Sequence, residues 1–220
     1  MEVFKYTNTG CREVNEDYVV SKDFGNDISL HLIADGMGGY EYGELASKVV
    51  GDSYVLAISN NMDILEATKV ASQDLHKEKL SLGVQKMGCT VAGVLIHDMV
   101  MTTFWAGDSR VYLYRAGELI YQTEDHSISN ELSKVRPLSF EERNRYSHLV
   151  TRSLMGDKGE DVETKEFKLE KGDEILICSD GLYKDCPIEY ILESIQKNCF
   201  DIHKNNLAFE DNHSLIYIKI

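Results

Sequence analysis

Several carboxylates stand where apolar stretches of the sequence begin or end. They are, in chain order, Glu16, Asp17, Asp35, Asp180 and Asp211. If the apolar stretches are strands, the carboxylates stand at strand ends, which is the arrangement that hard cations such as Mg²⁺ or Mn²⁺ need. Each one alone is as well explained by a turn in which the carboxylate bonds its own backbone. Their recurrence favours a metal site, and no cluster of His or Cys offers a zinc site instead.

Asp35 is the most informative of these carboxylates, because apolar residues 32–34 precede it and glycines follow it. Glycine lets the backbone turn sharply at the end of a strand. The carbonyl oxygen of Gly36 could then face the same ion as the carboxylate of Asp35. The competing interpretation is an ordinary Asp-Gly turn that binds no ligand.

The composition indicates one domain that does not bind nucleic acid. The chain has 220 residues, two prolines and no low-complexity stretch that would serve as a linker, so we expect residues 1–220 to form a single domain. Its formal net charge of -14 argues against binding the phosphate backbone of a nucleic acid, because such binding requires a basic surface.

The cysteines and the hydropathy of the chain indicate a soluble cytoplasmic protein without membrane association. The five cysteines are an odd number without paired spacing, which is typical of buried free thiols in a reducing compartment. The N-terminus has no basic segment followed by an apolar one. No apolar run approaches the roughly 18 residues that a membrane-spanning helix requires.

The hydrophobic pattern divides the chain into strands and helices. Apolar residues at helical spacing predict helices at about 43–59 and 63–80, and Pro187 is expected at the first position of a third. Strands are predicted at 2–7, 18–20, 28–34, 90–96, 100–106, 111–115, 119–122, 162–169, 174–178 and 214–220. Residues 126–148 are polar and weakly periodic, which is typical of a functional flap.

The order of these elements predicts the fold class. Short connections between successive strands are typical of antiparallel meanders rather than of parallel sheets. We therefore expect an α+β fold in which two antiparallel sheets pack together and helices flank them. This arrangement is a four-layer α-β-β-α sandwich.

The carboxylates belong to an ordered set of motifs that resembles the metal-dependent serine/threonine protein phosphatases, the PPM or type 2C family, in its bacterial form. The motifs are, in chain order, GCREVNED (10–17), ADGMGG (34–39), GELAS (43–47), GCT (88–90), AGDSRVY (106–112), EDHS (124–127), LVTRSLMG (149–156), SDGL (179–182) and DN (211–212). They follow the order of the family over nearly the whole chain, and such a set is far more specific than any single motif.

The resemblance implies two metal ions in the site. Asp35 would bridge two Mn²⁺ or Mg²⁺ ions, and Asp180 with Asp211 would complete the ligands of one. Glu16 and the carbonyl of Gly36 would bind the other, and water molecules would fill many positions. The two ions would lower the pKa of a bridging water, and the resulting hydroxide would attack phosphorus in line.

The resemblance also implies roles for residues around the ions. Asp17 would orient a metal-bound water, and Asp108 with Asp180 would hold a third ion near the flap. Arg12 would bind phosphoryl oxygens through its planar fork, although without the resemblance a surface arginine is the commoner explanation. His126 lies in one of the motifs. A histidine at the junction of a strand and a flap, however, more often forms a hydrogen bond with the backbone than takes part in catalysis.

The expected activity is hydrolysis of phosphoserine and phosphothreonine in proteins, by a monomer that opposes a serine/threonine kinase. One alternative is a catalytically inactive pseudophosphatase that binds phosphoproteins, and that alternative predicts the loss of metal ligands. Another is a two-metal phosphodiesterase or nuclease, which uses similar carboxylates. The acidic charge and the order of the motifs argue against the nuclease.

Overall fold

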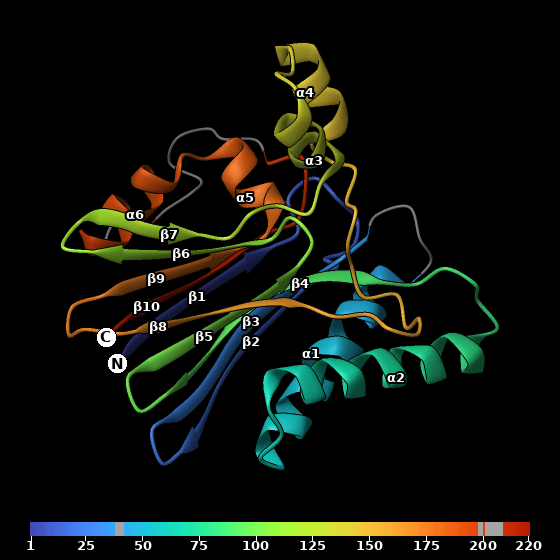
Figure 1. The fold of residues 1–220 in the computed structure, drawn as a ribbon, viewed down its shortest axis with the longest axis horizontal. Helices are drawn as coiled ribbons and strands as arrows, with labels where there is room; N and C mark the ends of the chain where they lie inside the picture. The colour runs from blue at the N-terminus through green and yellow to red at the C-terminus, as the bar shows by residue number, and fades with distance from the viewer. Residues whose placement is uncertain (38–41, 198–199, 201–208) are drawn as a thin grey trace.

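Two five-stranded antiparallel sheets form the centre of the computed structural model, which describes residues 1–37, 42–197, 200 and 209–220 (Figure 1). The first sheet contains β1 (Glu2–Asn8), β6 (Arg110–Arg115), β7 (Glu118–Gln122), β9 (Glu174–Cys178) and β10 (His213–Lys219). The second contains β2 (Asp17–Gly25), β3 (Ile28–Gly36), β4 (Cys89–His97), β5 (Val100–Ala106) and β8 (Glu163–Lys168). Their spatial orders are β1-β10-β9-β6-β7 and β2-β3-β4-β5-β8, and each neighbouring pair is antiparallel, as predicted.

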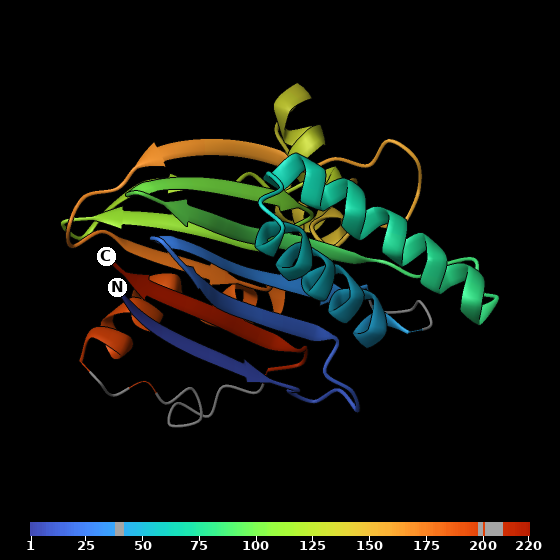
Figure 2. The ribbon, with the colours of Figure 1, turned by 90° about the horizontal axis from the view of Figure 1, so that it is seen from below.

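Helices cover the outer faces of both sheets. Helices α1 (Gly43–Ser59) and α2 (Ile64–Leu82) run side by side over the second sheet, as Figure 2 shows. Helices α5 (Asp180–Asp185) and α6 (Ile188–Gln196) pack on the first sheet. The order of the layers is therefore α-β-β-α, which confirms the predicted sandwich.

Three clusters of buried side chains hold these layers together, and β3 contributes to two of them. Ile33 packs with Ile177 of β9 and Ile216 of β10 between the sheets. Leu32 and Ala34, the neighbours of Ile33, belong instead to the cluster under α1 and α2. Side chains alternate between the two faces of a strand, so β3 is buried on both. Each large apolar side chain buried in this way stabilises the fold by about 1.5–3 kcal/mol.

The segment 126–148, predicted as a flap, contains two short helices that lie beyond the ends of the sheets (Figure 1). They are α3 (Ile128–Val135) and α4 (Phe140–Tyr146). Ser127 and Ser139 cap them by accepting a hydrogen bond from the backbone amide three residues later. The sequence did not predict these helices, because an apolar repeat is hard to recognise within eight and seven residues.

Other boundaries also differ from the prediction. The strand expected at 18–20 is longer, because β2 continues to Gly25. Asp180, two residues after the last residue of β9, was expected at a turn or strand end, whereas it is the first residue of helix α5. Helix α6 begins at Ile188, so Pro187 stands just before the first helical position rather than in it. Asp-Gly is a stronger turn signal than a helix signal, which explains why α5 was missed.

The cysteines are only partly as predicted. Cys89, Cys178 and Cys186 are buried free thiols, but Cys11 is exposed, which corrects the expectation for that residue. Cys11 lies in the polar loop before β2, where no apolar stretch covers it. Cys199, like the glycines at 38 and 39, lies outside the described residues. In the described ranges, no helix combines the length and the apolar character that crossing a bilayer requires.

Candidate active site

The predicted site residues come together in one pocket of about 590 Å³. Those that line it are Arg12, Glu16, Asp35, Gly36, Asp108, Asp180 and Asp211. Ile128 of α3 and residues 148–150, which follow α4, line the same pocket. Residues at or near the ends of five strands and residues of the segment 126–148 therefore share one cavity, although they are distant in the sequence.

The pairing of β2 with β3 sets the centre of the pocket. Asp17 and Asp35 stand directly opposite each other on the two strands, and Asp35 stands opposite Thr90 of β4 on its other side. Like charges directly opposite each other destabilise a pair of strands. A cation bound beside these two carboxylates would relieve their repulsion.

Close packing of α5 against the residues before β10 brings Asp180 and Asp211 to the same pocket. A Cβ atom on Gly181 would lie 2.1 Å from the backbone carbonyl oxygen of Asn212 and 3.0 Å from the Cβ of Asp211. Only glycine permits this approach, because any larger residue would force the two segments apart. The glycine of this Asp-Gly pair therefore allows α5 to pack closely against Asn212, and the pair does not form a turn.

The side chain of Asn212 holds the loop that carries Arg12 and Glu16. Its Oδ1 accepts a hydrogen bond of 2.8 Å from the backbone amide of Glu16. Its Nδ2 donates to the carbonyl oxygens of Thr9 and Val14, at 2.8 and 2.9 Å. The sequence contained Asn212 only as part of a motif, and its positioning role depends on contacts across about two hundred residues, which no local pattern reveals.

Asp17 lies behind the pocket and keeps one oxygen unpaired. Its Oδ2 accepts a hydrogen bond of 2.8 Å from the hydroxyl of Ser179. Its Oδ1 is buried and has no hydrogen-bond partner among the described residues. Burial raises the pKa of Asp17 to about 6. An unpartnered buried oxygen is costly, so this atom suits a hydrogen bond from a water held by an ion.

Asp35, Asp108 and Glu16 of the pocket also resist ionisation. Burial, together with the charges of Asp17 and Asp180, raises the pKa of Asp35 well above its ordinary value. Burial and the neighbouring Asp180 raise the pKa of Asp108 to about 7. Burial also raises the pKa of Glu16. These pKa shifts arise because negative charges are crowded together and buried, and a divalent cation would stabilise the ionised carboxylates.

Two basic side chains face this charge. The Nη2 of Arg12 lies 2.9 Å from Oδ2 of Asp211, and the Arg12 side chain is 53% exposed. The Nζ of Lys184 pairs with Oδ2 of Asp180 and lies 3.9 Å from Oδ2 of Asp108. Sequence reasoning identified Arg12 but missed Lys184. Its spacing of four residues from Asp180 would have been a signal only if α5 had been predicted.

His126 forms a hydrogen bond with the backbone, which is the role that the sequence favoured for it. Its Nδ1 accepts a hydrogen bond of 3.1 Å from the backbone amide of Gly107, and its ring stacks on Trp105 at 5.9 Å. Its Nε2 lies 3.2 Å from Oε1 of Glu163. Burial lowers the pKa of His126. The histidine fixes the junction between β5 and the flap segment, and it is not among the residues that line the pocket.

The pocket fits hard divalent ions that keep much of their water. Across the described ranges, no three His, Cys, Asp or Glu side chains converge tightly enough to hold an ion by themselves. Mg²⁺ is typically bound through one or two carboxylates while it retains several waters. The crowded carboxylates and the unpaired oxygen of Asp17 match that kind of coordination.

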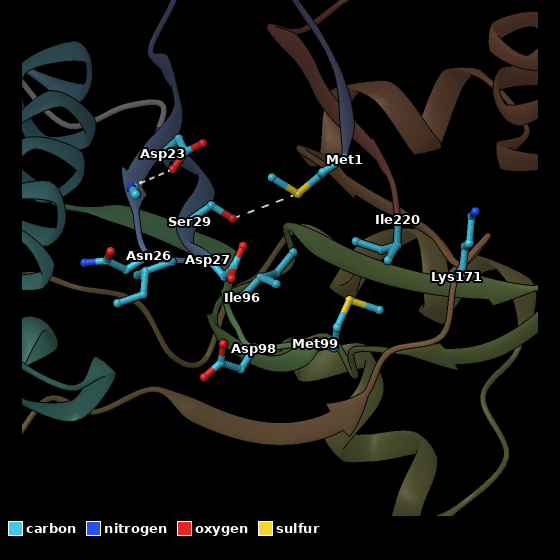
Figure 3. A pocket seen from close by; sticks show the side chains of 12 residues that line it. Met1, Asp23, Asn26, Asp27, Ser29, Ile96, Asp98, Met99, Lys171 and Ile220 are labelled. Atoms are coloured by element: carbon cyan, nitrogen blue, oxygen red, sulfur yellow. Dashed lines mark hydrogen bonds between the residues drawn. The ribbon is translucent and has the colours of Figure 1, made fainter.

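A second hollow, of about 880 Å³, lies at the other end of β3 (Figure 3). Asp23, Asp27 and Asp98 line it, and all three are exposed. Asp23 accepts a hydrogen bond of 2.7 Å from the backbone amide of Gly25. Asp27 and Asp98 have φ values of 56° and 50°, which are typical of aspartate in tight turns. Their positions are therefore explained by the turns that they form.

Comparison with known sequences agrees with this geometry. A family model described as protein phosphatase 2C matches residues 10–206. Protein phosphatase PhpP of Streptococcus pneumoniae is 31% identical over 195 residues, which cover 83% of this chain and 79% of that protein. Serine/threonine phosphatase stp of Listeria monocytogenes is 26% identical over 98% of this chain and 94% of that protein.

A solved structure is similar over nearly the whole chain. It is the catalytic domain of the serine threonine protein phosphatase PstP in complex with two manganese ions. Its TM-score with this chain is 0.80 at 26% identity, and the match covers 98% of this chain and 96% of that domain.

Proposed function

The chain belongs to the protein phosphatase 2C family, and we propose that its acidic pocket is where it removes phosphate from phosphoserine and phosphothreonine residues of proteins. It is a metal-dependent protein-serine/threonine phosphatase. The observation that carries the assignment of the site is the convergence of Asp35, Asp180 and Asp211 with Arg12 in one pocket. Carboxylates and an arginine are the groups that binding of metal ions and of a phosphoryl group requires.

We assign two ions, Mn²⁺ or Mg²⁺, to this pocket. Asp35 would be shared between them, with Asp180 and Asp211 on one ion and Glu16 with the carbonyl of Gly36 on the other. When bound, the ions would activate a water molecule and offset the charge that develops on the phosphoryl group. The two manganese ions of the PstP catalytic domain support both the number and the kind of ion.

The chain's own residues would bind the substrate and orient the nucleophile. Arg12 uses one nitrogen for Asp211 at the exposed side of the pocket, so further N–H groups of its fork are available to phosphoryl oxygens. Ser179 holds Oδ2 of Asp17 in place, so that Oδ1 would accept a hydrogen bond from the attacking water.

The proposal extends to the biological setting. The substrates would be proteins phosphorylated by a serine/threonine kinase, and the protein would act in the cytoplasm as a monomer, with residues 1–220 as one domain and a flap at about 126–148. Free thiols at Cys11, Cys89, Cys178 and Cys186 support a reducing compartment. The net charge of -14 argues against nucleic acid as a partner. A pseudophosphatase would have lost metal ligands, whereas all the expected ones line this pocket.

Hydrolysis of a phosphothreonine peptide, with Mn²⁺ titrated against a chelator, tests the proposed site. We expect turnover only with metal, and we expect Asp180→Asn to abolish it because the pocket loses a ligand. Asp185→Asn is the matched control, since it makes the same change at the other end of α5, outside the pocket. A folded chain that binds Mn²⁺ without turnover would contradict the proposal and favour a binding module.

A further inference from the structure

Lys184 places a positive charge between two carboxylates of the pocket. It lies on α5, four residues after Asp180, and its Nζ pairs with Oδ2 of Asp180. The same nitrogen lies 3.9 Å from Oδ2 of Asp108. The side chains of Asp108 and Asp180 are only 4% and 19% exposed, so both carboxylates are largely shielded from water.

This pairing differs from the ordinary lysine pairs on the helix surfaces. Lys48 pairs with Asp52, and Lys197 with Glu193, at the same spacing of four residues. The carboxylate side chains in those pairs are 54% and 61% exposed. Exposed pairs contribute little, because water screens them and the side chains lose entropy. The ammonium of Lys184 instead meets carboxylates withdrawn from water, where the attraction between charges is stronger.

An ammonium and a metal ion cannot both occupy the space between Asp108 and Asp180. Each would use the Oδ2 atoms that Lys184 now faces, a metal at roughly 2.1 Å from oxygen and a nitrogen at roughly 2.8 Å. Lys184 contacts Oδ2 of Asp180, so Oδ1 would stay available to another ion. A third ion between Asp108 and Asp180, which the sequence resemblance implies, would have to displace the lysine.

We propose that the ammonium of Lys184 takes the place of a third divalent ion between Asp108 and Asp180. Metal then binds only on the side of Asp35 and Asp211, and the positive charge beside Asp108 does not depend on the concentration of metal. This inference rests on the proposed function, because it requires that the pocket binds divalent ions.

The number of manganese ions bound per chain tests the proposal without measuring activity. Equilibrium dialysis against Mn²⁺ followed by elemental analysis gives this number for the parent protein, Lys184→Met and Lys184→Arg. Methionine keeps the length of the side chain and removes the charge, so we expect Lys184→Met to bind one additional ion. Arginine keeps the charge, so Lys184→Arg should bind the same number as the parent. Adding Asp108→Asn to Lys184→Met should restore the parent number.

The outcomes separate this inference from the proposed function. If the parent binds manganese and Lys184→Met binds no additional ion, the proposal that Lys184 replaces a third ion is wrong, while the proposed phosphatase site stands. The proposal about Lys184 is also wrong if the Asp108→Asn protein binds one manganese ion fewer than the parent. A parent that binds no manganese would overturn both. Circular dichroism and thermal unfolding confirm that each variant is folded, and Lys184→Gln takes the place of the methionine variant if that one is not.

Discussion

The two ends of β3 both gather carboxylates, yet only one end withdraws them from water. At the end that carries Asp35, Asp17 and Asp108 are buried, and burial with mutual repulsion raises the pKa values of these groups. At the other end, Asp27 and Asp98 are exposed at tight turns. The number of carboxylates therefore does not identify a metal site. Desolvated and crowded carboxylates do, because only they gain much from a bound cation.

The volumes of the two cavities do not identify the site either. The hollow beside Asp98 measures about 880 Å³, and the pocket at Asp35 about 590 Å³. The smaller cavity has the converging carboxylates and Arg12, whereas Met1 and Met99 take part in lining the larger one. Small divalent ions and a phosphoryl group require converging charged ligands more than they require space.

The largest expected effect comes from removing the charge at the centre of the pocket. Asp35→Asn should lower the turnover of a phosphothreonine peptide at least about 1,000-fold, which corresponds to about 4 kcal/mol of transition-state stabilisation. The reason is that asparagine is a poor ligand to share between two cations. Steady-state hydrolysis with saturating Mn²⁺ measures this effect.

The same variant should keep its fold. Asparagine removes repulsion from Asp17 and Asp180, so metal-free Asp35→Asn should resist urea at least as well as the metal-free parent. Turnover near that of the parent in a folded Asp35→Asn protein would show that the two ends of β3 do not differ in the way that we describe.

A smaller effect concerns stability without metal. The pKa of Asp108 rises from 3.8 to about 7 on folding, so between these pH values the folded chain retains a proton that the unfolded chain has released. Stability must then fall as the pH rises through this window. Between about pH 4.5 and about pH 7.5, the unfolding free energy of the chelated parent should fall by about 3 kcal/mol more than that of Asp108→Asn.

Urea unfolding at several pH values, in the presence of a chelator, measures this difference. Titrating groups away from Asp108, such as the buried His31, contribute equally to both proteins and cancel in the comparison. Asp35 does not cancel, because the charge of Asp108 helps to raise its pKa. Parallel pH profiles for the parent and Asp108→Asn would mean that Asp108 is not desolvated as the structure indicates.

Local patterns were sufficient to predict the layers and to find the carboxylates. Asp35 follows the apolar residues 32–34, and Asp180 follows the apolar strand β9, so each is marked by its own neighbours in the sequence. Alternation and helical spacing predicted the strands and the two long helices for the same reason. These features depend on contacts within one element or with its nearest neighbours.

The partners of the carboxylates could not be predicted, because they depend on packing between distant segments. Lys184 meets Asp108 only because the short helix α5 contacts the residues that follow β5, and an Asp-Gly signal favours a turn there over a helix. Asn212 holds Glu16 across 196 positions of the chain. Neither contact leaves a periodic signal in the sequence.

The smallest expected effect is at the other end of β3. Asp98→Asn should leave the turnover of the peptide, the number of bound manganese ions and the unfolding free energy nearly unchanged, the last within about 0.5 kcal/mol. The Asp98 side chain is 73% exposed, its contact with His97 is a surface pair of little energetic value, and asparagine tolerates its φ of 50°. The assays used for Asp35→Asn measure all three quantities. A loss of manganese binding in Asp98→Asn would place a metal site in the larger hollow, and exposure to water would then no longer distinguish the two ends of the strand.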